Sequence, residues 1–118
     1  MEGFRELYEK IRSVGRDEFI AMLSSASDEE LERIREMLEL IEIETNGKIE
    51  ALDPLIERAE LNADRKKLDE LLERKNRLLT ASGWITWKKA ALAFELARRG
   101  KGGEAVAQRL EEFILRHT

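Results

Sequence analysis

Residues 27–41 read SDEELERIREMLELI, and this stretch decides the fold. Ser27 and Glu30 have the spacing of a capping box, in which each side chain accepts a hydrogen bond from the other residue's backbone N–H. The apolar side chains that follow recur at intervals of three and four: Leu31, Ile34, Leu38 and Ile41. This period places them on one stripe of a helix. The stretch therefore predicts a long amphipathic helix that begins directly after Ser27.

The apolar repeat continues past residue 44, but turn signals interrupt it. Asn46-Gly47 is typical of a helix end, and Asp53-Pro54 is typical of a helix start. Because proline inside a helix costs about 3 kcal/mol, we expect a break between Thr45 and Asp53, with a kinked continuation as the alternative. A second long helix should then reach about Leu79, and Asn62-Ala63-Asp64 is a natural place for a further turn.

Two short helices are expected before this region. The first carries an apolar stripe that Gly15 should end in the left-handed conformation. The second should start at Asp17, whose carboxylate would cap its first turn. The apolar positions of the two helices are Phe4, Leu7, Tyr8, Ile11 and Val14, then Phe19, Ile20 and Leu23.

Two more helices are expected after Leu79. Residues 80–83 should end the long segment, and the helix after Gly83 is apolar nearly all round, so we expect it to be buried at the centre. A glycine-rich connection at 100–103 then leads into a last helix. The apolar positions of that helix are Val106, Leu110, Phe113 and Ile114.

Composition narrows the class of protein. With no cysteine, one proline and seven glycines, the chain lacks disulfides and is poor in the turn residues that sheets require. It has no apolar run that could cross a bilayer and no signal peptide, so we expect a cytoplasmic protein without a membrane segment. We predict one all-α domain over 1–118: a helical bundle with a long charged coiled-coil-like hairpin or rod (about 28–80) and a compact cap of shorter helices.

The charges are sorted along the chain. Residues 1–64 hold 8 Lys or Arg against 18 Asp or Glu, whereas residues 65–101 hold 11 against 4. Such asymmetry serves either pairing between the chain's own helices or a charged partner. The candidate residues for binding an acidic partner are Arg74, Lys75, Arg77, Lys88 and Lys89. The candidates for a basic partner are Glu32, Glu36, Glu39 and Glu42.

The basic stretch has two interpretations. Its cations could follow a phosphate backbone, with Trp84 and Trp87 stacking on bases. We favour the other interpretation, in which residues 65–77 pack beside the acidic helix and the tryptophans belong to the core. Both tryptophans are in phase with Phe94, as expected for one buried stripe.

No complete catalytic or metal-binding set is evident. His117 is the only histidine, and Ser24, Ser25 and Ser27 have no evident base beside them. The carboxylates fall mostly on solvated helix faces rather than in a cleft. The glycine-rich turn after Arg99 lacks the strand and the Lys-Ser/Thr pair of a phosphate-binding loop. We therefore expect no enzyme, no cofactor and no bound metal.

Binding is the function that remains. We expect a small non-enzymatic protein-binding module, a regulator, adaptor or inhibitor, that acts through charged helix faces. A long amphipathic hairpin exposes more apolar surface than short helices can cover, so a homodimer is expected. The alternatives are a nucleic-acid-binding protein that uses residues 65–101, and an acidic inhibitor from a mobile element whose carboxylates, between residues 29 and 60, imitate DNA.

Overall fold

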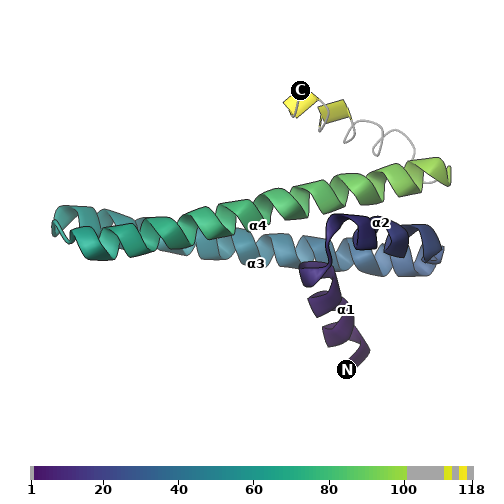
Figure 1. Cartoon of the computed structure of the whole chain (residues 1–118), viewed down its shortest axis with the longest axis horizontal. Coiled ribbons are helices and arrows are strands. Elements are labelled where there is room, and N and C mark those ends of the chain that lie inside the picture. The colour runs from purple at the N-terminus through teal and green to yellow at the C-terminus, as the bar shows by residue number, and fades with distance from the viewer. Residues whose placement is uncertain (1, 101–110, 113–114, 117–118) are drawn as a thin grey trace. The chain divides into compact units, whose positions relative to one another are not determined.

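The computed structural model describes residues 2–100, 111–112 and 115–116. Four helices are defined between Glu2 and Arg98 (Figure 1): α1 (Glu2–Ser13), α2 (Arg16–Ser25), α3 (Asp28–Leu61) and α4 (Arg65–Arg98). The all-α fold with a long hairpin is confirmed, since α3 and α4 are antiparallel arms of 34 residues each. In the part of the chain that the structure describes, none of the helices has the length and apolarity that a bilayer span requires.

The chain divides into two compact units. Unit 1 comprises Met1–Glu39 and Thr86–Thr118, and unit 2 comprises Leu40–Ile85. Unit 1 therefore contains α1, α2, the start of α3 and the end of α4, whereas unit 2 is a hairpin made from the remainder of the two long helices.

The capping box at the start of α3 is confirmed. The Ser27 hydroxyl accepts a hydrogen bond from the Glu30 backbone N–H at 3.1 Å, and the Glu30 carboxylate accepts one from the Ser27 N–H at 3.5 Å. Each side chain satisfies a backbone donor that has no partner within the helix. Because these bonds are local, the start of α3 could be read directly from the sequence.

The expected break between Thr45 and Asp53 is wrong, because α3 runs unbroken from Asp28 to Leu61 with Pro54 inside it. Thr45, Leu52 and Ile56 are buried along one stripe, and Leu52 and Ile56 pack with Leu71 in the core of unit 2. A break would remove that stripe from the seam between α3 and α4. Burying a large aliphatic side chain contributes roughly 1.5–3 kcal/mol, so two of them offset the proline.

The turn lies instead at Asn62-Ala63-Asp64, the second of the sequence signals. The Ala63 N–H donates to the Glu60 carbonyl and the Asp64 N–H to the Ala59 carbonyl, at 3.1 and 3.0 Å. This pair of bonds is a Schellman motif, with Ala63 in the left-handed region at φ 53°. Asp64 then caps α4, since its carboxylate accepts a hydrogen bond from the Lys67 N–H at 3.1 Å.

The expected end of a helix at residues 80–83 is also wrong, because α4 continues to Arg98. Leu71, Ile85 and Leu92 are buried at spacings of fourteen and seven residues, and the partly buried Leu78 lies midway between Leu71 and Ile85, so one continuous stripe extends past Gly83. An interior glycine costs only about 1 kcal/mol, which does not outweigh that burial. The helix is not buried all round either: Trp84 is 43% exposed and Phe94 is 54% exposed.

Two cap predictions for the short helices are wrong. Gly15 has φ −77° and ψ 178°, an extended conformation, and it is the N-cap of α2 rather than a left-handed end to α1. No side chain caps α2. Asp17 lies in the first turn of α2, where the negative charge of its carboxylate interacts favourably with the helix dipole. The helix predicted after Gly103 lies outside the described residues, and so does His117. The apolar positions of that helix are Val106, Leu110, Phe113 and Ile114.

Candidate interaction surfaces

The five residues predicted to bind an acidic partner have different environments. Arg74 and Arg77 are exposed on α4 in unit 2. The Lys75 ammonium instead turns to α3 and pairs with the Asp53 carboxylate at 3.0 Å. This ion pair supports the interpretation that residues 65–77 pack beside the acidic helix, while Arg74 and Arg77 remain available at the surface.

Lys88 is not available to a partner, because it is 5% exposed within unit 1. Its ammonium donates to the Ile11 backbone carbonyl at 2.6 Å, near the end of α1. It also lies 5.8 Å from the centre of the Phe19 ring. Burial lowers the pKa of Lys88. This lysine therefore binds the otherwise unpaired carbonyls of a helix end. Lys89, the fifth candidate, is half-buried.

The candidates for a basic partner follow α3. Glu32, Glu36 and Glu39 are exposed in unit 1, and Glu42 is half-buried in unit 2. The Glu32 carboxylate also lies 3.7 Å from the Arg35 guanidinium in an exposed pair. Such pairs contribute little in water, so the carboxylates of unit 1 remain open to solvent and to a partner.

A polar cluster that the sequence did not reveal joins α4 to α2 and α3 in unit 1. The Arg99 guanidinium donates to the Leu23 carbonyl at the end of α2 at 2.9 Å. It also donates to Glu95 at 2.8 Å and to Asp28 at 3.2 Å. The spacing of Glu95 and Arg99 indicates a pair within one helix, but the contacts with α2 and α3 depend on tertiary structure.

Glu95 is the acidic centre of this cluster and is 8% exposed. Hydrogen bonds from Arg98 and then Arg99 lower the pKa of Glu95 to about 2, against the opposing effect of its burial. The carboxylate is therefore ionised at neutral pH and holds both guanidinium groups. Arg98 and Arg99, two cations of the basic stretch, therefore both pair with Glu95.

Trp87 also packs against other side chains of unit 1. Its ring lies 6.1 Å from the Phe19 ring, centre to centre, and the Arg16 guanidinium lies 5.1 Å from the centre of Trp87. These contacts agree with the interpretation that Trp87 belongs to the core. Trp84 differs, since nearly half of its surface is exposed.

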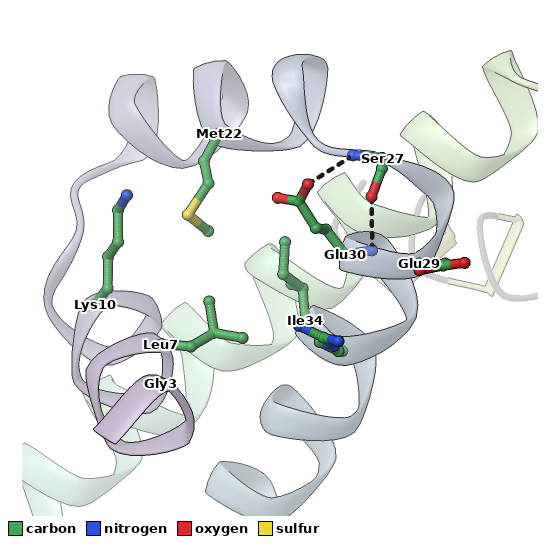
Figure 2. A pocket seen from close by; sticks show the side chains of 9 residues that line it. Gly3, Leu7, Lys10, Met22, Ser27, Glu29, Glu30 and Ile34 are labelled. Carbon is green, nitrogen blue, oxygen red and sulfur yellow. Dashed lines mark hydrogen bonds between the residues drawn. The ribbon is translucent and has the colours of Figure 1, made fainter. Parts of the chain in front are cut away.

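A groove of about 460 Å³ lies between α1, α2 and the start of α3 (Figure 2). Leu7, Met22 and Ile34 supply apolar side chains, and Lys10 and Arg33 contribute two cations. Glu30 also borders the groove, but it is engaged in the capping box with Ser27, as the dashed lines in Figure 2 show. The groove therefore combines an apolar lining with charges of both signs.

Among residues 2–100, 111–112 and 115–116, no group of three or more His, Cys, Asp or Glu is placed to hold a metal ion. Comparison of the chain with protein-family models, with curated proteins and with solved structures found no match.

Proposed function

We propose that the chain is a small non-enzymatic protein-binding module, a regulator, adaptor or inhibitor, that forms a homodimer through the hairpin of unit 2. One observation carries this proposal: Leu72 and Leu79 form a second apolar stripe on α4, next to Leu68, which packs against the core of unit 2. Leu72 is 41% exposed and Leu79 is 48% exposed. Because they are seven residues apart, the two side chains lie on the same side of the helix.

A hairpin of two helices explains why this stripe stays open. Each helix uses one side for the seam, where Leu52 and Ile56 pack with Leu71. A second stripe needs a further element to cover it. Contiguous apolar surface on a monomer commonly marks an interface. The other large apolar side chains exposed in unit 2 are Leu40, Ile43, Leu55, Leu61 and Trp84.

A second copy of α4 fits the stripe. In an antiparallel pair about a two-fold axis near Asn76, Leu72 of each copy would pack beside Leu79 of the other. The length from Leu68 to Gly83 is about 24 Å of helix, enough for several turns of contact. Gly83 lacks a side chain and would leave room opposite Leu68 of the other copy.

Sedimentation velocity over a range of concentrations tests the dimer. The wild-type chain is expected to have about twice the monomer mass of 13.7 kDa. The double variant Leu72→Lys/Leu79→Lys is expected to be a monomer with unchanged helical content by circular dichroism. Leu61→Lys is the matched control, because Leu61 is exposed at the end of α3 and away from the stripe. A monomeric wild-type chain, or a dimeric double variant, would contradict the proposal.

The second candidate function is nucleic-acid binding by residues 65–101. The observation in its favour is that Arg65, Lys66, Lys67, Arg74 and Arg77 are exposed and form no ion pair with another described residue. Binding to duplex DNA should then weaken with salt, with a logarithmic slope of about 0.9 per phosphate contacted. Absence of binding to DNA and RNA at low salt would exclude this candidate.

A further inference from the structure

We infer that one side of α4 in unit 2 is a docking site for an acidic amphipathic helix of a partner protein. This inference deepens the proposed function, on which it rests, by naming the chemistry of the partner. The site, called the α4 stripe below, consists of Lys67, Glu70, Arg74, Arg77, Ala81 and Trp84.

The geometry follows from the unbroken helix. Consecutive residues of the α4 stripe are three or four positions apart, so they lie along one side of α4. All six are exposed. The stripe extends over about 26 Å, the length of a partner helix of about 18 residues. If α4 had ended at residues 80–83, as the sequence suggested, Trp84 would have no fixed position relative to Arg74 and Arg77.

The α4 stripe has a cationic part and an apolar part. Arg74 and Arg77 form no ion pair with any described residue, and a guanidinium can hold a carboxylate through two parallel hydrogen bonds. Ala81 and Trp84 follow within two turns, and Trp84 offers a large, partly exposed ring. Arginine and tryptophan are the residue types that contribute most to protein interfaces. A helix with carboxylates opposite the arginines and an aliphatic side chain opposite Trp84 matches both parts.

Within the hairpin itself, α4 already holds a carboxylate of another helix through a cation that lies beside apolar side chains. On another side of α4, Lys75 holds Asp53 of α3 at 3.0 Å, beside the apolar core of unit 2. An acidic helix therefore packs along α4 through cations and apolar side chains together. Lys75 is used in that contact, whereas Arg74 and Arg77 lie on a side that α3 leaves exposed.

The α4 stripe is separate from the proposed dimer surface. Leu72 precedes Arg74 by two positions, which corresponds to about 200° around the helix. Leu79 follows Arg77 by two positions and is displaced by the same angle. A dimer formed through Leu72 and Leu79 would leave the α4 stripe accessible, so both contacts can exist at once.

An acidic protein helix fits the α4 stripe better than a nucleic acid does. Glu70 lies within the stripe, and Asp69 and Glu73 lie on the same turns of α4. These carboxylates would repel an evenly charged phosphate backbone, whereas a protein helix can place a polar side chain opposite Glu70. Binding of single strands usually depends on several stacking aromatic side chains, and the stripe offers only Trp84.

A designed peptide tests the inference. The probe is a fluorescein-labelled helical peptide of about 18 residues with glutamates spaced for Arg74 and Arg77 and a leucine spaced for Trp84. Titration with the full chain, followed by fluorescence anisotropy, should give saturable binding. When every glutamate of the peptide is replaced by glutamine, the affinity should fall by about tenfold or more.

Variants of the full chain locate the contact. Arg74→Ala/Arg77→Ala and Trp84→Ala are each expected to weaken binding of the glutamate peptide by about tenfold or more. Arg65→Ala is the matched control, because it removes an exposed cation from another side of α4, and binding should stay within about twofold. Circular dichroism on each variant shows whether the helices remain intact.

Three results would overturn the inference: no binding of the glutamate peptide, equal binding by the Arg74→Ala/Arg77→Ala variant, or tighter binding of duplex DNA than of the peptide at equal salt. The mass of the same samples separates this inference from the proposed dimer. Loss of peptide binding with an intact dimer contradicts only the inference, whereas peptide binding by a monomer contradicts only the dimer.

Discussion

Units 1 and 2 are built from the same two long helices, yet they bury side chains to different depths. The largest fully buried side chains, Phe19, Ile11, Leu31, Ile34 and Leu38, all belong to unit 1. The core of unit 2, formed by Leu52, Ile56, Ala59 and Leu71, retains 3–9% exposure. The difference has a simple cause: α1 and α2 cover the helices of unit 1, whereas among the described residues unit 2 consists of α3 and α4 alone. The hairpin of unit 2 therefore leaves Leu72 and Leu79 on α4 exposed.

Polar contacts differ in the same way. In unit 1, two cations donate to backbone carbonyls in the last turns of other helices: Lys88 of α4 donates to Ile11 of α1, and Arg99, directly after α4, donates to Leu23 of α2. In unit 2, the exposed ion pair between Lys75 and Asp53 joins α4 to α3. Buried, geometrically defined hydrogen bonds fix an arrangement more strongly than a half-exposed ion pair does. Unit 1 is thus the more tightly specified part of the described chain.

Matched truncations of leucine give the largest expected effects. Leu31→Ala in unit 1 should lower the free energy of unfolding by about 4 kcal/mol, because Leu31 is fully buried and its removal leaves a cavity. Leu52→Ala in unit 2 should cost about 2 kcal/mol, since the narrow seam is close to solvent and can relax. Urea denaturation measures both values. Equal costs would show that the two units do not differ in packing.

Removal of the proline inside α3 should stabilise unit 2. Pro54→Ala restores a backbone N–H for the Glu50 carbonyl and removes the clash of the ring, so we expect a gain of about 2–3 kcal/mol in urea denaturation. Gly47→Ala is the companion variant, because nothing lies within 4 Å of the added Cβ. Its gain should be about 0.5–1 kcal/mol. A loss of stability in Pro54→Ala would contradict the unbroken helix.

The Glu95 cluster should give unit 1 a sensitivity to acid. Because the pKa of folded Glu95 is lowered to about 2, its contribution is complete above the ordinary value of 4.5 and is lost as the pH falls towards 2. Glu95→Gln should cost about 1–2 kcal/mol at neutral pH, since the hydrogen bonds to two guanidinium groups lose their charge. Between about pH 5 and 2, the free energy of unfolding of the Glu95→Gln variant should also fall less steeply than that of the wild type.

Glu32→Gln is the control for this experiment, because Glu32 is an exposed carboxylate in a single pair with Arg35. Its stability should follow the wild-type curve of unfolding free energy against pH, measured by urea denaturation at each pH. If Glu95→Gln and Glu32→Gln behave alike in acid, the Glu95 cluster does not contribute as the structure indicates.

The smallest expected effect lies at the turn of unit 2. Ala63 has φ 53°, which places its Cβ in the unfavourable left-handed region. Ala63→Gly should therefore raise the free energy of unfolding by about 0.5–1 kcal/mol. Ala51→Gly, at an exposed position inside α3, should lower it by a similar amount. Changes of the same sign in thermal or urea denaturation would contradict the Schellman turn.

Local signals and long-range packing explain which predictions were right. The capping box at Ser27 and Glu30 was predictable, since both hydrogen bonds lie within four residues. The breaks expected at 45–53 and at 80–83 were wrong, because Pro54 and Gly83 are local signals that a continuous stripe of burial overrides. Of the candidate binding residues, Arg74 and Arg77 lie at the surface, whereas Lys88 is buried by α1, which no local pattern reveals.

The sequence by itself determined the helical class, the start of α3 and the sorting of acidic and basic residues, because propensity, capping and charge act within a few positions of one another. Tertiary structure decided which of two turn signals is used and which cations remain at the surface. These outcomes depend on side chains far apart in the chain, such as Lys88 with Ile11 and Leu52 with Leu71. The free energy of such contacts exists only once the helices have packed.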